Sequence, residues 1–483
     1  MQNVKAKTLR IQSFTKETIS KVNFSKSIFF GLVLTTLLSQ NEAKAQLTVT
    51  GQIRPRSEVR DGQGTLQKEG DDAALFTSQR TRLNVGYTGY RFKAFMALQD
   101  VRVWGQDASS INRNTTEVNN GIMLHEAWTE ILLNDTVSKF QNISLKIGRQ
   151  EIAYDDQKVL GNLDWLQQGR RHDAVVFKFA NKGWIADLGA AFNQNKELAV
   201  GTLYNGNPPA TAGYPAGTNG IGTMYKSFQY AYVGKKFFFG DLSLLFFKDD
   251  FNKYTTPAGV YTPVGGVWSR TTSGLYYNVN LTRKINFTGS YYYQGGRDKT
   301  GRVLSANLAS ITSTVQLGRK LFVGPGVDFL SGTDGTKAVT ADSRSNRFDP
   351  LYGTPHKFWG TMDYFYVASP FGNQGLLNYF FKAKYNYTDK LTFFADVHGF
   401  QSANAVSNGA GGTRTRYLGT ELDLKMTYNF TKLINIEAGY SYMQATNTMS
   451  SAQVKGVANA DLTPQWAYLA LKISPNFLAT KKM

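Results

Sequence analysis

The most constraining feature of the sequence is an alternation of apolar and charged residues in the stretch LTVTGQIRPRSEVR, residues 47–60. From Gln52 to Arg60 every second residue is polar or charged, while Ile53 and Val59 have the opposite parity. Because the side chains of a β-strand point alternately to the two faces of a sheet, this period of two predicts a strand. The same alternation recurs at residues 376–387 and 415–430. The chain is therefore predicted to be all-β.

Strand length and loop length together favour a closed antiparallel transmembrane β-barrel over a soluble sandwich. About eighteen alternating segments occur, many with Tyr, Phe or Trp near an end, which suits tilted crossings with aromatic girdles. Tight and long connections alternate, as expected of short periplasmic turns and long extracellular loops. We predict strands at residues 47–60, 78–87, 91–104, 122–134, 143–152, 171–180, 184–194, 225–237, 241–250, 267–280, 285–295, 303–316, 320–331, 376–387, 391–401, 415–430, 433–446 and 465–474.

The first 45 residues have the order of a secretory signal peptide. Several Lys and Arg residues precede the apolar run IFFGLVLTTLL at 28–38, which is followed by AKA at 43–45. That run is shorter than the roughly 20 residues that a membrane-spanning helix needs. No apolar stretch of that length follows residue 45, so only a closed barrel can cross a membrane. We predict a signal peptide at 1–45 and one outer-membrane barrel domain at 46–483.

Net charge and cysteine content narrow the kinds of binding partner and metal site that the protein can have. The formal charge is +19, and residues 1–45 hold seven basic and two acidic side chains, which leaves +14 on the predicted mature chain. A basic secreted protein is better matched to anionic solutes, acidic polysaccharide or lipopolysaccharide phosphates than to nucleic acid. The absence of cysteine excludes disulfides and thiolate metal sites. We predict neither a cofactor nor a metal, and a monomer is favoured.

Charged side chains share one parity within three predicted strands. An arginine near the bilayer midplane costs about 2–4 kcal/mol on the lipid face of a barrel, so these residues are expected to face the lumen. Two interpretations of this lining remain open: cross-strand pairs that brace the barrel, or a surplus of arginine that attracts anions. The residues concerned are Arg54 and Arg56, Arg80 and Arg82, and Glu126 with Glu130.

Motifs in residues 145–173 resemble the alginate-export porin family. They are Gly148-Arg149-Gln150-Glu151, Leu160-Gly161 with Asp164-Trp165, and Gln168-Gly169-Arg170-Arg171 with Asp173. Residues 98–105 and 348–365 also resemble this family. The resemblance implies an eighteen-stranded barrel with an arginine-rich constriction through which an anionic polyuronate passes. Guanidinium groups bind carboxylates bidentately, which suits such a path. Carried over by motif, the pathway residues are Arg102, Arg149, Arg170 and Arg171, with Asp100, Glu151 and Asp173 as partners.

The sequence predicts an outer-membrane channel for acidic polysaccharide or uronate oligomers. The alternatives are a porin for small anions and a structural or adhesive barrel. An enzyme is not favoured, because none of the four histidines, His125, His172, His356 and His398, lies in a nucleophile or metal-site spacing. The long connection at 332–372 is expected either to fold inward as a constriction or to project outward as a binding surface.

Overall fold

A computed structural model describes residues 45–106, 121–134, 141–196, 199, 203–204, 225–255, 262–338, 343–365 and 373–480. The chain divides into two units, residues 1–45 with 482–483, and residues 46–481. All but Ala45 of the predicted signal peptide lies outside the described residues. Within the described part, helical structure is limited to η2 (Pro355–Lys357) and α2 (Asn447–Ser450), and no helix there is long and apolar enough to cross a membrane.

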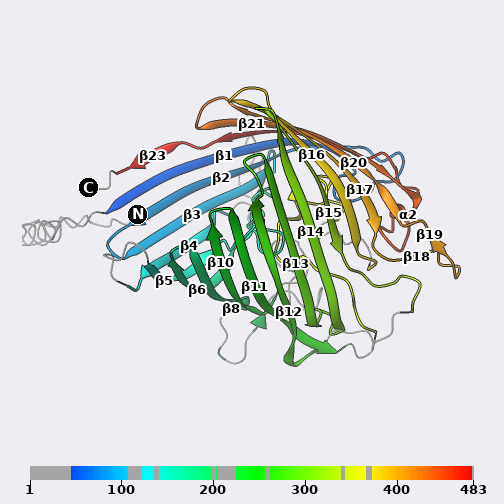
Figure 1. Cartoon of the computed structure of the whole chain (residues 1–483), viewed down its shortest axis with the longest axis horizontal. Helices are drawn as coiled ribbons and strands as arrows, with labels where there is room; N and C mark the ends of the chain where they lie inside the picture. Colours follow the sequence, from blue (N-terminus) through cyan, green and yellow to red (C-terminus); the bar gives the residue numbers. More distant parts are fainter. Residues whose placement is uncertain are drawn as a thin grey trace, which may run out of the picture. The chain divides into compact units, whose positions relative to one another are not determined.

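Eighteen antiparallel crossings close into a barrel (Figure 1). Each strand pairs with the next along the chain, and β22 pairs back onto β1. β23 (Asn476–Ala479) follows β22 after a break at Ser474 and Pro475 and also pairs with β1, so nineteen strand segments make eighteen crossings. The crossings are β1 (Gln46–Asp61), β2 (Ala74–Thr88), β3 (Phe92–Val103), β4 (Met123–Leu132), β5 (Gln141–Gln150), β6 (His172–Asn181), β7 (Trp184–Phe192), β10 (Ser227–Phe237), β11 (Gly240–Thr255), β12 (Thr262–Asn280), β13 (Ile285–Arg297), β14 (Val303–Leu317), β15 (Leu321–Leu330), β16 (Leu376–Asn386), β17 (Leu391–Ser402), β20 (Tyr417–Asn429), β21 (Ile434–Ala445) and β22 (Gln465–Ile473).

The predicted fold class is confirmed, because every predicted strand has a counterpart in the barrel. The ends differ by a few residues, most at β11, which ends later than expected, and at β2 and β12, which begin earlier. Short strands also pair within the connections: β8 (Gln194–Lys196) with β9 (Leu203–Tyr204), and β18 (Val406–Ser407) with β19 (Thr413–Arg414). The alternation of loop lengths has an exception at residues 298–302, a short connection between β13 and β14.

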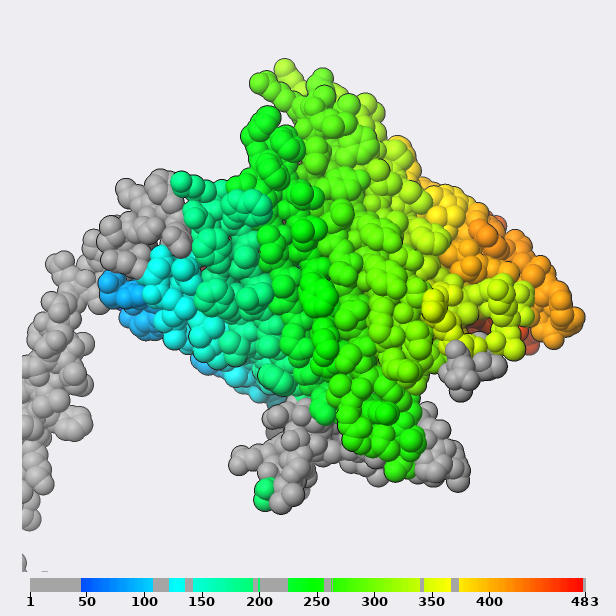
Figure 2. Space-filling view, turned by 60° about the horizontal axis from the view of Figure 1, so that its bottom comes forward, coloured from blue at the N-terminus to red at the C-terminus, as the bar shows by residue number. Residues whose placement is uncertain are grey.

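Apolar side chains cover the outer face of the barrel. Leu83 on β2 and Met96 on β3 are 40% and 38% exposed, whereas Arg80 is 0% exposed. Residues paired in register share a face, so the pairs of Leu83 with Leu98 and of Val85 with Met96 define an apolar outer surface. Figure 2 shows the strands following one another across this surface in sequence order. The opposite parity holds most of the polar residues and faces inward.

The connection at residues 151–171, which we call the first inner segment, folds into the barrel. Tyr154 donates a hydrogen bond to Asp187 on β7 at 2.7 Å, and Lys158 Nζ lies 3.0 Å from Asp328 on β15. The same segment contacts Arg54 on β1. A single segment that touches strands so far apart around the circumference must cross the interior.

Residues 343–365, the second inner segment, also fold inward and carry much of the apolar core. Phe348, Trp359 and Tyr364 are fully buried, and Leu160 of the first inner segment forms a parallel bridge with Tyr352. The open question about the connection at 332–372 is therefore answered for the described residues: this part lies inside. The core of the molecule sits in the lumen, where the two inner segments pack against the inner faces of the strands.

Candidate functional site

Arginines of β1 and β2 hold the first inner segment. Arg54 donates to the backbone oxygen of Asp164 at 2.8 Å and to Gln167 Oε1 at 3.0 Å. Arg80 Nη1 lies 2.8 Å from Asp164 Oδ1, and Arg82 Nη1 lies 3.7 Å from the same oxygen. Burial acts to raise the pKa of Asp164, but the guanidinium groups of Arg80 and Arg54 outweigh it and lower the pKa. One ionised carboxylate therefore faces three arginines, and Glu151 and Glu126 also lie near Arg82.

Arg56, in contrast, is paired. Its Nε lies 2.8 Å from Glu58 Oε1, and Arg60 lies 2.9 Å from the other oxygen of that carboxylate. The Arg56 guanidinium stacks on Trp165 at 4.2 Å from the ring centroid. Trp466 Nε1 also donates to Glu58 at 3.1 Å. The bracing interpretation thus fits Arg56 and Arg60, which share the carboxylate of Glu58.

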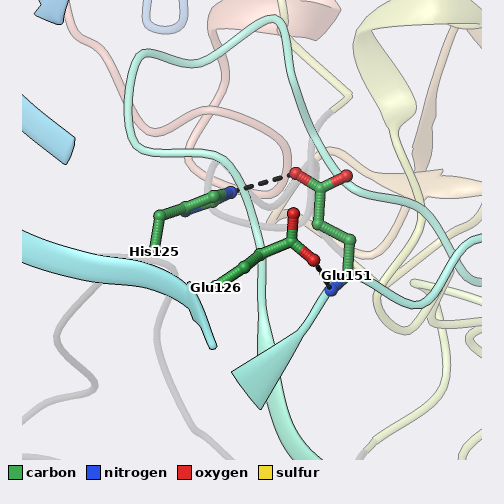
Figure 3. Close-up of side chains that lie close together, drawn as sticks. All are labelled: His125, Glu126 and Glu151. Atoms are coloured by element: carbon green, nitrogen blue, oxygen red, sulfur yellow. Dashed lines mark hydrogen bonds and ion pairs between the residues drawn. The ribbon is translucent and has the colours of Figure 1, made fainter. Parts of the chain in front are cut away.

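His125, Glu126 and Glu151 form a cluster (Figure 3). Arg82 lies beside this cluster. His125 Nε2 is 3.0 Å from Glu151 Oε1, and the ligand atoms of the three lie within 4.8 Å of one another, close enough to hold a metal ion. However, Arg82 Nη2 lies 2.9 Å from the same Nε2, so a guanidinium charge already occupies this position and would repel a cation. Gly169 packs here because a Cβ would lie 2.9 Å from the imidazole. The cluster anchors the first inner segment.

Sequence reasoning missed this cluster. Glu126 was predicted as a lumen residue, and it does lie on the inner face, where its Oε2 accepts hydrogen bonds from Trp128 Nε1 and the Glu151 backbone. His125 was considered only for catalysis. The one available signal was the adjacency of His125 and Glu126, because Glu151 is 25 residues away along the chain and meets them only through the register of β4 and β5.

Three predicted pathway residues, Arg102, Arg149 and Asp173, lie on the outer face of the barrel. Arg149 pairs in register with Ala127 and Asp173, and shares the face of Ile147, which is 43% exposed. Its guanidinium forms a bidentate pair with Asp173 at 2.8 and 2.9 Å.

Arg102 likewise shares the outer face with Leu98 and forms a bidentate pair with Asp100 at 2.7 and 2.8 Å. The carry-over by motif ignored strand parity, which turns these side chains away from the lumen.

The remaining predicted residues are placed as follows. Arg170 donates to the backbone oxygens of Tyr352 and Gly353, so it fastens the first inner segment to the second. Arg171 is half-buried at the end of that segment, where burial and the neighbouring Arg149 lower its pKa. Glu130 lies on the inner face and accepts a hydrogen bond from Ser144 at 2.7 Å.

A cavity of 630 Å³ lies between the inner segments and the strands β16 to β22. Trp165 and His356 form a flat stacked pair beside it, with ring centroids 4.3 Å apart and an interplanar angle of 8°. Basic side chains outnumber acidic ones in its lining. The basic ones are Arg54, Arg56, Lys357, Lys382, Lys425 and Lys472, and the acidic ones are Asp164, Asp396, Asp423 and Glu437.

The lysines of this cavity differ in their pairing. Lys382 lies 3.2 Å from Asp396, whereas Lys425 and Lys472 make no ion pair with any described residue. Burial lowers the pKa of Lys357, against the opposing effect of Asp156 and Asp164. Lys425 and Lys472 on one wall, together with Arg54 beside Asp164 on the other, give the lining more basic than acidic side chains.

Comparison with known proteins agrees with this architecture. Residues 45–191 match the alginate export family. The crystal structure of Pseudomonas aeruginosa OpdO is similar over 89% of this chain and 98% of that one, with a TM-score of 0.57 and 13% identity. P. aeruginosa OpdK crystallised with vanillate is similar over 90% and 99%, with a TM-score of 0.54 and 10% identity. No curated protein matches the chain in sequence.

The match over residues 45–191 confirms the predicted resemblance, and the fold is that of outer-membrane porins. Together they indicate the bacterial outer membrane. The barrel therefore lies in a lipid and lipopolysaccharide environment. The chain is an eighteen-stranded, porin-like barrel of the outer membrane whose residues 45–191 match the alginate export family.

Proposed function

We propose that this barrel is a channel for small organic anions, and that the charged cavity is where they bind in transit. The observation that carries the proposal is the surplus of basic over acidic side chains in a cavity of 630 Å³. That volume lies in the range typical of small-molecule sites, about 300–1,000 Å³. The proposal includes no catalytic step.

Firm attachment of the inner segments argues for a small solute. Arg270 on β12 pairs with Asp349 at 2.7 Å and with Asp249 at 2.6 Å, and Tyr352 donates to Asp249 at 2.8 Å. Glu421 on β20 accepts from the Met362 backbone at 2.8 Å. Breaking a buried ion pair by removing one partner costs about 3–5 kcal/mol, so such contacts hold a constriction in place. A bulky polymer would have to displace them.

The cavity also favours a solute that combines a ring with a carboxylate. The stacked pair of Trp165 and His356 lines the cavity and supplies aromatic surface for contact with a sugar or aromatic ring. Arg54 and the unpaired Lys425 and Lys472 supply cationic groups for the carboxylate. OpdK, a porin with the same fold, has been crystallised with vanillate, which is compatible with this class of solute.

Passage of an acidic polysaccharide is the second candidate, because the family match is to alginate export. In that case the inner segments would have to move aside. The two candidates differ in one measurable way: a small uronate should enter the cavity, whereas a long oligouronate should do so only if the constriction opens.

Planar-bilayer recording tests the proposal. We expect the wild-type protein to conduct and glucuronate to reduce the current reversibly, while an oligouronate has little effect. The Trp165→Ala variant should weaken the block by glucuronate. Strong block by the oligouronate with none by glucuronate would favour the polysaccharide candidate. A barrel that never conducts would contradict both and favour a structural role.

A further inference from the structure

The short turns of the barrel carry an unusual concentration of basic residues. These turns lie at the end of the barrel that also holds the start of β1, since Gln46 pairs with Thr88 next to the turn between β2 and β3. Among the described residues of these turns, Asp389 is the one acidic side chain. These turns hold Arg91, Lys182, Arg283, Lys284, Arg319, Lys320, Lys390 and Lys432, and Lys235 lies near the same end of β10. We call these nine residues the periplasmic basic ring.

Most of the ring is exposed and lacks a carboxylate partner. Seven members are exposed residues that make no ion pair with any described residue: Lys182, Arg283, Lys284, Arg319, Lys320, Lys390 and Lys432. Among them, Lys320 alone has a side-chain hydrogen bond to a described residue, the Tyr387 backbone, and the other six have none. This differs from the outer-face arginines at the other end of the barrel. There, Arg102 and Arg149 are each bound bidentately by an aspartate. The charge of the ring is therefore available to an external anion.

Ring members lie beside apolar side chains of the lipid-facing surface. Lys235 Nζ lies 4.8 Å from the centroid of Trp184, a residue 49% exposed, and donates to the backbone of Lys182 at 3.0 Å. Lys320 donates to the backbone of Tyr387 at 2.7 Å, and Tyr387 is itself exposed. Aromatic side chains next to lysine and arginine mark the level at which a barrel meets lipid headgroups.

We propose that the periplasmic basic ring binds the phosphates of anionic phospholipids in the periplasmic leaflet. The distribution of the charge decides between this and a protein partner. The ring is contributed by turns from β2/β3 around to β20/β21, so it surrounds the barrel. A protein docking from one side would contact a few of these turns, whereas annular lipids contact all of them. Lysine and arginine near a membrane surface are attracted to anionic lipid.

The test compares spin-labelled phosphatidylglycerol with spin-labelled phosphatidylcholine bound to the barrel in phosphatidylcholine vesicles. We expect the wild-type protein to prefer phosphatidylglycerol by about five-fold at low salt, the size expected when each annular lipid meets one basic side chain. Because exposed charges are screened by ions, the preference should fall at high salt. A variant with glutamine at Lys182, Arg283, Lys284, Arg319, Lys390 and Lys432 should lose it.

The control variant carries Lys382→Gln, Lys425→Gln and Lys472→Gln, which remove basic charge from the lumen and leave the ring intact. It should keep the lipid preference. The proposal is wrong if the wild type shows no preference, or if the six-fold variant keeps it. It is also wrong if the six-fold variant loses anion permeability in pure phosphatidylcholine while lipid preference is unchanged, because the ring would then serve the solute. The salt dependence of the wild type decides the question even if the six-fold variant fails to insert.

Discussion

Two groups of arginines in nearby strands lie on opposite faces of the barrel. Arg54 on β1 and Arg80 on β2 face inward and converge on Asp164 of the first inner segment. Arg102 on β3 and Arg149 on β5 face outward, and each is neutralised by an aspartate. The residue type is the same, and β2 and β3 are adjacent. What differs is parity relative to the apolar positions of each strand.

This difference shows how much a charged side chain in a barrel depends on its face. On the inner face an arginine can reach loop backbone, carboxylates and solute, so a surplus of charge is possible. On the outer face charge has to be neutralised locally or kept near the membrane surface. Arg149 is next to the end of β5, which allows its pair with Asp173 to lie at the rim.

Replacing Arg80 with methionine should have the largest effect. Arg80 is fully buried and bonds both Gln52 and Asp164, so its loss leaves a carboxylate with weaker compensation. We expect the free energy of unfolding to fall by about 3–5 kcal/mol, as for other buried pairs that lose one partner. Urea unfolding in vesicles measures this change. A smaller fall in the free energy of unfolding than in Arg149→Gln would contradict the difference between inner-face and outer-face arginines.

Moving a charge between faces should have the next largest effect. Leu83→Arg places a guanidinium on the lipid face of β2, which costs about 2–4 kcal/mol near the midplane. The adjacent Asn84→Arg places the same group on the inner face and should cost much less. Unfolding of the two variants under one set of conditions tests this, and equal losses would contradict the assignment of faces.

Lowering the pH should loosen the first inner segment only under strongly acidic conditions. Arg80 and Arg54 lower the pKa of Asp164 in the folded protein. The ionised Asp164 carboxylate therefore stabilises the folded state above its ordinary pKa of 3.8. This stabilisation is lost as the pH falls through the lower pKa of the folded protein. The protection of the backbone amides of residues 161–168 against hydrogen exchange should therefore persist at mildly acidic pH. It should fall only below about pH 4. The Asp164→Asn variant should show the faster exchange at neutral pH. Early loosening in the wild type, near pH 6, would point to another titrating group.

Replacing Arg149 with glutamine should have the smallest effect. Its pair with Asp173 is exposed, and such pairs contribute about 0–1 kcal/mol. We expect unfolding to change within that range and ion preference to stay as in the wild type. Asp173→Asn is the matched variant. A large change in ion preference in either variant would contradict this expectation and would indicate that Arg149 acts on the permeating anions.

The fold could be predicted almost fully from the sequence, because alternation and turn residues are local signals. The inner segments could not. Their positions depend on contacts such as Lys158 with Asp328 and Arg170 with Tyr352, which join residues more than 150 positions apart. The outer position of Arg149 was within reach, since Leu145 and Ile147 share its parity. A family motif specifies which residue types occur, but not which face of the strand they occupy.

Ion preference in planar bilayers under a salt gradient tests the central claim most directly. One variant removes inner-face charge through Lys382→Gln, Lys425→Gln and Lys472→Gln, and the other removes outer-face charge through Arg102→Gln and Arg149→Gln. We predict an anion-preferring wild type, loss of that preference in the inner-face variant and no change in the outer-face variant. A reversal potential that is unaltered by the inner-face changes, or shifted equally by both sets, would contradict the account.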